Sequence, residues 1–546
     1  MGKTDTTVAV AKNALLSVYD KAGIAEFAAG LAKDGWRIYA SGGTAKAVAA
    51  TGVEVHDVTE LVGGEAILGH RVVTLSREIH AGILADDSDE HTAELQRLNI
   101  PRISLVCVDM YPLQAAIADP AGTERAVVEM TDIGGPTMLR AAAKGRRIVL
   151  SRPEQRAPVL AWLQAGKPDE QAFLRELAAI AEYETARYVL TSARYLGGDA
   201  VTGFTGKRVA VPRYGENPWQ TNAALYADDA RTDPLALSNF VLRGGTELSF
   251  TNYTDVDRLL QTMTHAAAVF AKNSKTGAVP AIALGCKHGN MCGAGVATKP
   301  AAAIQKMLKG DPRAIFGGAV MLNTVITKDL ANELLTHGMS GTKRLLDVVV
   351  AAGIEDDALA VLQRKGGKLR VIVNPALGGL TEDSLDTAPR FRYVRGGILQ
   401  QDNYTFVFDI ASPELERHGK ALTAKQIKDM QLAWAVGSTS NSNTITLVKD
   451  GRLIGNGVGQ QDRVSAAELA VKRTNDAGHD PKGAIAYSDS FFPFPDGPLK
   501  LADAGVAAIL ASRGSVRDGD VAKALTDAGV TFWTLPDTTI RGFFNH

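Results

Sequence analysis

A lysine and a histidine stand side by side soon after a short apolar run of the sequence. The run is 281–284, Ala-Ile-Ala-Leu, and the pair is Lys287–His288. An imidazole titrates near neutral pH and can act as a general base, while a neighbouring ammonium group can stabilise developing negative charge. The pair therefore predicts proton transfer and oxyanion stabilisation at a strand end. An exposed pair without a role is the alternative that these residues leave open.

Two cysteines flank the same pair, so a metal site is a second interpretation. Cys286, His288 and Cys292 are of ligand types that bind zinc. Their spacing is not that of a zinc knuckle, and the H-x-E and P-C-x-x-C motifs of a zinc deaminase are absent. The sequence favours the lysine–histidine dyad, and we expect no metal here.

Polar loops in the first part of the chain have residue types that suit a phosphate. The loop 41–44, Ser-Gly-Gly-Thr, lies between a predicted strand and a predicted helix, where backbone N–H groups can face an anion. The segments 17–21, Ser-Val-Tyr-Asp-Lys, and 132–137, Asp-Ile-Gly-Gly-Pro-Thr, are similar loops. Loops at the carboxyl ends of parallel strands share one crevice. We therefore expect the three loops to converge there, with plain turns as the alternative.

Two later segments carry groups that suit a nucleotide. The segment 213–220, Arg-Tyr-Gly-Glu-Asn-Pro-Trp-Gln, offers a guanidinium for phosphate beside an aromatic ring that can stack on a base. The aromatic stretch 488–497 contains Asp489 and Asp496. A carboxylate beside aromatic rings can accept a hydrogen bond from the N–H edge of a flat heterocycle. A solvated turn and an ordinary core segment remain the alternatives at these positions.

The elements that position these groups follow from the apolar pattern. Strands are predicted at 14–18, 36–40, 53–58 and 103–108, with helices at 23–33 and 45–50. This alternation predicts a parallel sheet covered by helices on both faces. A long helix at 169–196 and a linker that extends to residue 208 follow. The remainder mixes further strands and helices, and 366–402 is the predicted separation between two lobes.

Composition excludes several classes of protein. The 546 residues include 59 Lys+Arg and 60 Asp+Glu, so the net charge of -1 argues against a nucleic-acid partner. No apolar run approaches the ~18 residues of a membrane span, and no secretory segment is visible at the start. Three cysteines cannot form a disulfide framework. We expect a cytoplasmic protein of several domains.

Taken in order, these motifs resemble the bifunctional purine-biosynthesis family that joins an inosine monophosphate (IMP) cyclohydrolase to a transformylase acting on aminoimidazole carboxamide ribonucleotide (AICAR). The matching segments are 17–21, 41–45, 132–137, 140–144, 213–218, 287–288, 316–318, 442–443, 457–463 and 488–494. The resemblance implies a methylglyoxal-synthase-like α/β domain at 1–200. It also implies a transformylase at 201–546 with two cytidine-deaminase-like lobes, 201–385 and 386–546.

The implied reaction transfers formyl from 10-formyltetrahydrofolate to AICAR. The product, formyl-AICAR (FAICAR), then closes to IMP with loss of water. The implied assembly is a homodimer with transformylase sites at its interface, and neither a metal nor a membrane is involved. The transformylase residues implied by the family are catalytic Lys287, His288 and Asn443, and substrate-binding Arg213, Tyr214, Arg463, Asp489 and Arg541.

The family also implies a site in the cyclohydrolase half, where this sequence departs from its pattern. Lys144 is the implied proton-transfer group, and the implied substrate-binding residues are Lys21, Ser41, Gly42, Gly43, Thr44, Arg71, Thr74, Tyr111 and Asp132. Val73 and Ser76 replace a lysine and a histidine of the family, and Asp109 replaces an asparagine. A carboxylate here repels a substrate phosphate unless it is protonated or paired. In the other half, Met291 and Trp219 replace a proline and a histidine.

Two alternative functions follow from these departures. One is a monofunctional transformylase whose N-terminal domain binds nucleotide without catalysis. The other is a non-catalytic purine-ribonucleotide sensor that kept its pockets. The Lys287–His288 pair argues against the sensor, because a sensor has no use for a base beside the reacting amine.

Overall fold

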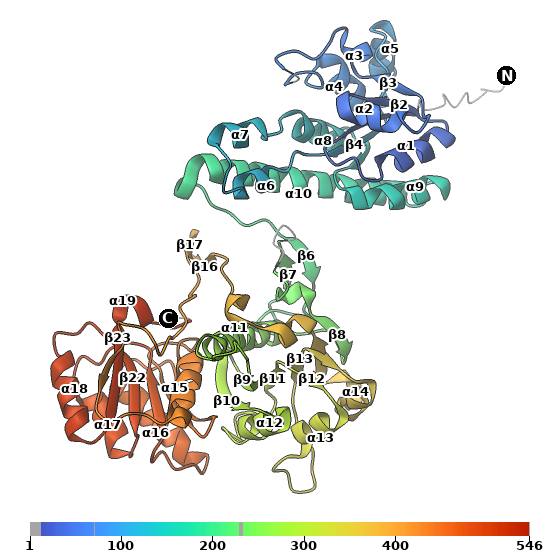
Figure 1. The fold of residues 1–546 in the computed structure, drawn as a ribbon. Helices are drawn as coiled ribbons and strands as arrows, with labels where there is room; N and C mark the ends of the chain where they lie inside the picture. The colour runs from blue at the N-terminus through green and yellow to red at the C-terminus, as the bar shows by residue number, and fades with distance from the viewer. Residues whose placement is uncertain (1–11, 70, 229–232, 545–546) are drawn as a thin grey trace. The chain divides into compact units, whose positions relative to one another are not determined.

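The computed structural model describes residues 12–69, 71–228 and 233–544, which form two compact units that meet in sequence between Gly206 and Lys207 (Figure 1). The first unit contains a five-stranded sheet in the order β3-β2-β1-β4-β5, and every pair of neighbours is parallel. Its strands are β1 Asn13–Val18, β2 Arg37–Ala40, β3 Val55–Asp57, β4 Leu105–Asp109 and β5 Ile148–Leu150. The predicted parallel α/β sheet is confirmed.

The helices of the first unit follow the predicted apolar spacing. α1, Ile24–Lys33, buries Ile24, Phe27 and Leu31, and α10, Glu170–Gly197, is the predicted long helix. The others are α2 Gly42–Ala49, α3 Thr59–Val62, α4 Arg77–Leu84, α5 Asp89–Arg97, α6 Leu113–Ala118, α7 Glu124–Glu129, α8 Gly134–Lys144 and α9 Arg156–Gln164. The segment after α10 contains only a short 3-10 turn before β6.

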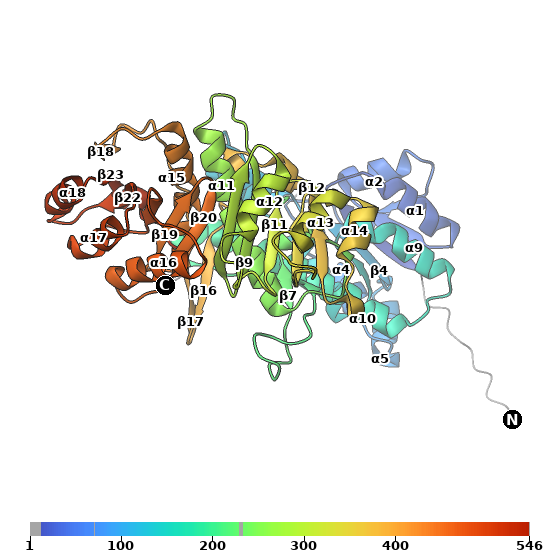
Figure 2. The ribbon, with the colours of Figure 1, turned by 90° about the horizontal axis from the view of Figure 1, so that it is seen from below.

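The second unit is organised around one twelve-stranded mixed sheet (Figure 2). Its order is β18-β23-β22-β21-β19-β20-β10-β9-β11-β13-β15-β8. The first-half strands are β8 Val241–Gly244, β9 Ala281–Lys287, β10 Asn290–Ala297, β11 Ala319–Leu322, β13 Val348–Ala351 and β15 Arg370–Val373. The second-half strands are β18 Glu416–His418, β19 Ile445–Lys449, β20 Arg452–Gly457, β21 Ile485–Ser488, β22 Ala508–Arg513 and β23 Thr531–Pro536.

The two halves of this sheet repeat one topology that the sequence does not reveal. Each half has an antiparallel hairpin, then an antiparallel neighbour, then two parallel strands and an antiparallel edge strand. The hairpins β9–β10 and β19–β20 meet at the seam, where Gly295 pairs with Arg452 in antiparallel register. This register brings the turn between β9 and β10 to the same sheet edge as the end of β20.

Helices cover both faces of the second sheet. α11, Phe250–Lys272, and α15, Ala424–Gly437, contact each other and share one core that spans both halves. The opposite face carries a separate core under each half. Its helices are α12 Pro300–Leu308, α13 Lys328–Thr336, α14 Asp356–Leu362, α16 Arg463–Asp476, α17 Asp496–Asp503 and α18 Asp518–Asp527. The short α19 is Asp537–Ile540.

The segment around β15 corrects one expectation. The segment 366–402 was predicted to separate two lobes, but β15 lies within it because its Val-Ile-Val run is buried in the first half of the sheet. Two hairpins lie outside the sheet, β6–β7 (Lys207–Ala210 and Leu225–Ala227) and β16–β17 (Arg390–Val394 and Gly397–Gln401). The two-stranded sheet of β12 Val325–Ile326 and β14 Gly353–Ile354 completes the unit.

Of the helices in the described residues, none combines the length and the apolar character that crossing a bilayer requires.

Candidate active sites

The lysine–histidine pair lies on the tight turn of the β9–β10 hairpin. His288 and Gly289 both have left-handed backbone, with φ of 53° and 70°. Two such residues in succession form the hairpin turn that matches the twist of its strands. Lys287 Nζ donates to Phe316 O at 2.7 Å, while the His288 side chain is exposed. The ammonium is thus anchored, and the imidazole is free to meet a ligand.

A second group of polar side chains surrounds the start of α16. The Arg463 guanidinium donates to Asn443 Oδ1 and lies 3.5 Å from Asp489 Oδ1. Asn443 Nδ2 in turn donates to Gln460 O at 3.0 Å. Asp489 is 0% exposed, and its Oδ2 makes no hydrogen bond among the described residues, although the Ser442 hydroxyl and the Thr444 N–H face the carboxyl. A buried acceptor without a donor is costly, so this oxygen is suited to an N–H of a ligand.

Several contacts place these two groups at one edge of the sheet. Arg258 on α11 donates to Thr439 O and, at 3.2 Å, to Asn441 Oδ1. Asn456 near the end of β20 donates from Nδ2 to Met291 O at 3.3 Å. The first contact connects α11 to the segment before Asn443, and the second connects the end of β20 to β10. Five predicted residues of one chain therefore line the same edge of the sheet: Lys287, His288, Asn443, Arg463 and Asp489.

Arg541 belongs to this edge as well. Its guanidinium forms an ion pair with Asp537 at 2.8 Å, and Asp537 also lies 3.3 Å from the hydroxyl of Ser490, which follows Asp489. The Arg541 guanidinium is 5.6 Å from the centre of the Phe491 ring. The positive charge of Arg541 is thus partly balanced and lies close to the buried acid.

Arg213 and Tyr214 lie elsewhere in the described chain. They precede a closed loop in which Gly215 N donates to Gln220 O and Asn217 N donates to Gln220 Oε1, both at 2.7 Å. Arg213 is exposed, and no described contact joins this loop to Lys287, His288 or Asp489. Trp219 in the same loop is 77% exposed. The structure therefore does not bring these two predicted residues to the site within one chain.

The repeated topology creates a counterpart of this edge with different chemistry. A cavity of about 240 Å³ lies there, lined in part by Asn323 and Pro300. Asn323 directly follows β11 as Asp489 follows β21, and Pro300 begins α12 as Arg463 begins α16. The Asn323 amide is used internally, accepting from Ile282 N at 2.8 Å and donating to Pro280 O at 2.9 Å. This edge has therefore lost the acid and the guanidinium.

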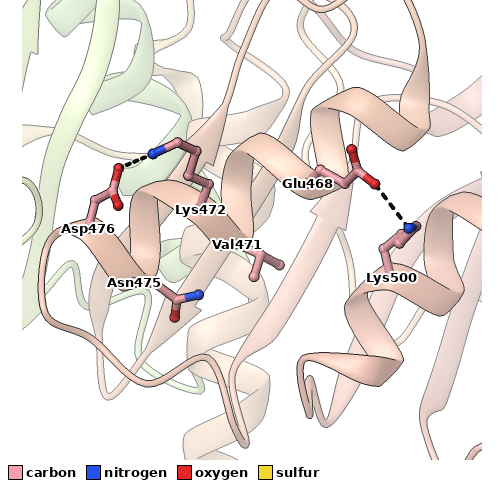
Figure 3. Close-up of a pocket in the computed structure, with 6 residues that line it drawn as sticks. All are labelled: Glu468, Val471, Lys472, Asn475, Asp476 and Lys500. Atoms are coloured by element: carbon pink, nitrogen blue, oxygen red, sulfur yellow. Dashed lines mark hydrogen bonds and ion pairs between the residues drawn. The ribbon is translucent and has the colours of Figure 1, made fainter.

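Another surface groove has no free charges to offer. It measures about 430 Å³, and its lining residues come from α16 and α17 (Figure 3). Lys472 pairs with Asp476 at 2.6 Å, and Lys500 pairs with Glu468 at 3.0 Å. Because these charges satisfy one another in solvent, we assign the groove no chemistry.

The phosphate-type loops of the first unit meet at the carboxyl ends of β1, β2 and β4. Lys21 Nζ donates to the carbonyls of Val18 and Tyr19, and a side chain on Gly43 would contact the Lys21 stem at 3.3 Å. The Thr44 hydroxyl exchanges hydrogen bonds with the Val18 backbone, each at 3.1 Å. Ser41 and Gly42 begin α2, and the Ser41 hydroxyl makes no capping bond. Burial lowers the pKa of Lys21, although the nearby carboxylates Asp109 and Asp20 oppose this.

Asp132 anchors the other side of this crevice. It accepts from Gly135 N at 2.8 Å, and burial raises its pKa. The same acid interacts with Tyr111, whose ring meets that of Tyr19 at 5.6 Å. A side chain on Gly134 would contact Thr74 Oγ1 at 2.8 Å, so Thr74 lies against the same helix start. These contacts bring together all three predicted loops.

Two predicted residues of the first unit, Arg71 and Lys144, take no part in these contacts. Arg71 is exposed and forms an ion pair with Glu129. Lys144 is the last residue of α8, whereas Asp132 lies just before the first. Ten residue steps of an α-helix cover about 15 Å, and α8 runs antiparallel to the strands it connects. Lys144 is therefore at the opposite edge of the sheet from the crevice of its own unit.

The substituted positions have local structural roles. Ser76 caps α4 by accepting from Ile79 N at 3.1 Å, and Val73 packs against the apolar core. Asp109 accepts from Tyr19 N at 2.6 Å and from Asp20 N at 3.0 Å. Burial raises the pKa of Asp109, and its pairing with these two N–H groups reduces its repulsion of an anion.

The sequence did not predict a role for two charged residues on α11, the acid Asp255 and the cation Arg258. Asp255 accepts from Gly289 N, and Arg258 contacts the segment before Asn443. The available signal was a cluster of three charged residues, Asp255, Asp257 and Arg258, near the start of a helix that buries a long apolar stretch. Among the described residues, no group of three or more His, Cys, Asp or Glu side chains is placed to hold a metal ion.

The buried acid Asp489 provides a test by pH. Burial raises its pKa more strongly than the Arg463 guanidinium lowers it. A raised pKa in the folded state means that the acid's stabilising contribution is present at low pH and is lost as pH rises through that pKa. We expect the melting temperature of the unmodified chain, relative to that of Asp489→Asn, to fall as pH rises from about 4 to 8. Calorimetry measures this difference, and a constant value would contradict the raised pKa.

Comparison with known proteins identifies the class first. A family model described as an MGS-like domain matches residues 23–137, and one described as the AICARFT/IMPCHase bienzyme matches residues 142–473. The two units of the fold and these two family matches thus define a two-unit α/β bienzyme. The bifunctional purine biosynthesis protein PurH of Bacillus cereus is 34% identical, covering 95% of this chain and 97% of that protein. PurH of Mycobacterium ulcerans is 35% identical, with 96% of each chain covered.

This chain belongs to the AICARFT/IMPCHase bienzyme family. A crystal structure of a protein named ForH is also similar, with 35% identity, 35% of this chain and 99% of that chain covered, and a TM-score of 0.30.

Proposed function

We propose that this chain is a bifunctional enzyme of purine biosynthesis. It transfers formyl from 10-formyltetrahydrofolate to AICAR and closes the product FAICAR to IMP. The proposal rests on family membership and on one observation above all. The exposed imidazole of His288 shares a sheet edge with the buried, unpartnered oxygen of Asp489. A reacting aromatic amine requires a general base, and the ring that carries it requires a hydrogen-bond acceptor for its N–H groups.

The transfer step asks for a base and a cation. The AICAR amine is a weak nucleophile because its lone pair is delocalised into the ring and carboxamide. His288 takes the amine proton as nitrogen bonds to the formyl carbon, and Lys287 with Asn443 stabilises the tetrahedral oxyanion. The carbon–N10 bond of the folate then breaks, and N10 receives a proton. Arg463, Asp489 and Arg541 bind the substrates, joined by Arg213 and Tyr214.

The closure step uses the first unit. The carboxamide nitrogen of FAICAR attacks the formyl carbon, and the carbonyl oxygen leaves as water. Lys21 and the loop 41–44 hold the phosphate together with Arg71 and Thr74, while Tyr111 and Asp132 face the reacting ring. Because burial raises the pKa of Asp132, this acid is suited to exchanging a proton.

Lys144, as the proton-transfer group, must enter this crevice from a second copy of the chain, since it lies at the far edge of its own unit. We expect Lys144→Ala and Asp132→Asn each to abolish closure. In randomly mixed dimers of the two variants, half of the dimers are mixed and each has one intact site. Closure should then return to about one quarter of the unmodified rate. No recovery after co-expression would contradict a shared site.

The organisation of the enzyme is proposed on the same basis. Residues 1–200 form the cyclohydrolase, and 201–546 form the transformylase with lobes 201–385 and 386–546. A homodimer with transformylase sites at its interface would allow the partner's Arg213 and Tyr214 to complete each site. Exposed apolar residues on the β16–β17 hairpin, such as Tyr393 at 78%, support a partner surface. Three free cysteines support a reducing, cytoplasmic location.

Two assays test the proposal and its alternative. The first supplies AICAR with 10-formyltetrahydrofolate, and we expect FAICAR and then IMP. The second supplies FAICAR without folate, and we expect ring closure above the spontaneous rate. Transfer without closure would favour a monofunctional transformylase, in which Val73 and Asp109 have disabled the first unit. Binding of AICAR without either reaction would favour a sensor.

A further inference from the structure

The turn that carries Lys287 and His288 rests on a carboxylate from α11. Asp255 Oδ1 accepts from Gly289 N at 2.7 Å, and the Cys286 thiol donates to the same oxygen at 3.6 Å. The backbone N–H of His288 faces this carboxylate too. Burial raises the pKa of Asp255, and these donors oppose that shift. Asp255 is thus tied to the turn on both sides of His288.

The backbone of the turn needs such support. His288 adopts left-handed φ of 53°, a region that is unfavourable for residues with a side chain. Gly289 follows with φ of 70°, which glycine adopts without strain. If the turn relaxed, the imidazole would swing away from the sheet edge that holds Asn443 and Asp489. A hydrogen bond at Gly289 N is positioned to prevent this.

The second half of the sheet contains the same device without the histidine. Asp429 is the sixth residue of α15, as Asp255 is of α11. It accepts from Asp450 N at 2.9 Å and from Gly451 N at 2.5 Å. Asp450 and Gly451 have φ of 59° and 69°, so the two turns match. Holding the hairpin turn by an aspartate is therefore a property of the repeat.

The side chains on the second turn are committed to structural contacts. Lys449 Nζ donates to Asp480 O at 3.1 Å and to Lys482 O at 2.6 Å. Asp450 forms an ion pair with Lys425. The first turn presents its imidazole to solvent instead. Asp429 therefore holds a turn with only structural side chains, whereas Asp255 holds a turn that carries a reactive group.

We propose that Asp255 is a positioning residue for formyl transfer, which orients His288 and Lys287 by holding the backbone of their turn. This inference rests on the proposed role of His288. Asp255 contacts the backbone of the turn and the Cys286 thiol, so its effect appears in turnover rather than in AICAR binding. Displacing a catalytic group by about 1 Å can lower turnover by about 10²-fold.

The test compares three variants of the full chain. Asp255→Leu removes the acceptor, Asp255→Asn retains an oxygen that can accept from Gly289 N, and Asp429→Leu makes the same change at the matched structural turn. We expect Asp255→Leu to lower kcat for formyl transfer by about 10²-fold with KM for AICAR unchanged within about threefold. Asp255→Asn should restore most of that loss, and Asp429→Leu should keep the kcat of the unmodified chain.

Other outcomes overturn the inference. If Asp255→Leu keeps its kcat, or if Asp429→Leu loses as much, then the hydrogen bond has no specific role. Histidine NMR provides a readout that does not need activity, because the chain has 10 histidines and His288→Ala identifies the relevant signal. That signal should change in Asp255→Leu and stay in place in Asp429→Leu. A His288→Ala variant with full transfer activity would contradict the proposed function itself. If His288→Ala is inactive but Asp255→Leu is fully active, only the positioning role of Asp255 is contradicted.

Discussion

Replacing His288 by alanine should lower kcat for formyl transfer by about 10²- to 10⁴-fold, the range that a general base contributes. AICAR affinity should stay within a few-fold, because the phosphate and the heterocycle are bound by Arg463, Asp489 and Arg541 in the proposed site. The imidazole is exposed on its turn, so its removal leaves no unpaired group in the core. Stopped-assay turnover and calorimetric AICAR binding measure the two quantities separately.

The matched control for this prediction is His418→Ala. His418 lies on the edge strand β18 of the same sheet and belongs to no proposed site. Its replacement should leave both turnover and binding intact. Unchanged turnover in His288→Ala would refute the assigned base. An equal fall of affinity and turnover would instead assign His288 to substrate binding.

Replacing Asp132 by asparagine should remove ring closure and leave formyl transfer intact. The asparagine oxygen can still accept from Gly135 N, which the aspartate holds at 2.8 Å, so the start of α8 keeps its shape. Only the ability to exchange a proton is lost, and we expect closure to slow by about 10²-fold or more. Closure is measured with FAICAR alone, and transfer is measured with AICAR and 10-formyltetrahydrofolate.

Asp119→Asn is the control for this variant. Asp119 accepts from Ala121 N at 2.9 Å in an exposed turn of the same unit and belongs to no proposed site. It should retain both activities. A loss of transfer together with closure in Asp132→Asn would show that the two reactions are not separated between the two units.

The crevice of the first unit could be predicted from sequence because its geometry follows from local order. The loops 17–21 and 41–44 each come directly after a strand, and neighbouring parallel strands place both at one edge. Lys21 and Thr44 therefore meet without further information, whereas Asp132 follows α7 and reaches this edge through its contact with Tyr111. Lys144 shows the limit of this reasoning. Asp132 precedes the start of α8 and Lys144 ends it, so the helix holds these two predicted residues at its opposite ends.

The edge in the second unit could not be assembled in the same way. His288 and Asn443 are far apart in sequence, and they share an edge only because β10 pairs with β20. That pairing depends on the repeat, which is visible in strand order and in Asp255 and Asp429 but not in any run of similar residues. Without it, Asp255 reads as one more charge on a helix.

The departures from the family in the first unit have a physical reading in the structure. Asp109 gives up its oxygens to the N–H groups of Tyr19 and Asp20, which the loop then cannot offer to a phosphate. Val73 brings no charge to compensate. Anion binding in this crevice therefore depends mainly on Lys21 and the start of α2. For this reason we expect the departures from the family to reduce ring closure more than formyl transfer.

The most direct test of the account follows one carbon atom through both reactions. The purified chain is supplied with AICAR and 10-formyltetrahydrofolate labelled with ¹³C in the formyl group. We expect the label to appear first in FAICAR and then in IMP, at the ring carbon between the two nitrogens of the six-membered ring. Unlabelled AICAR recovered intact, with the label still on the folate, would contradict it.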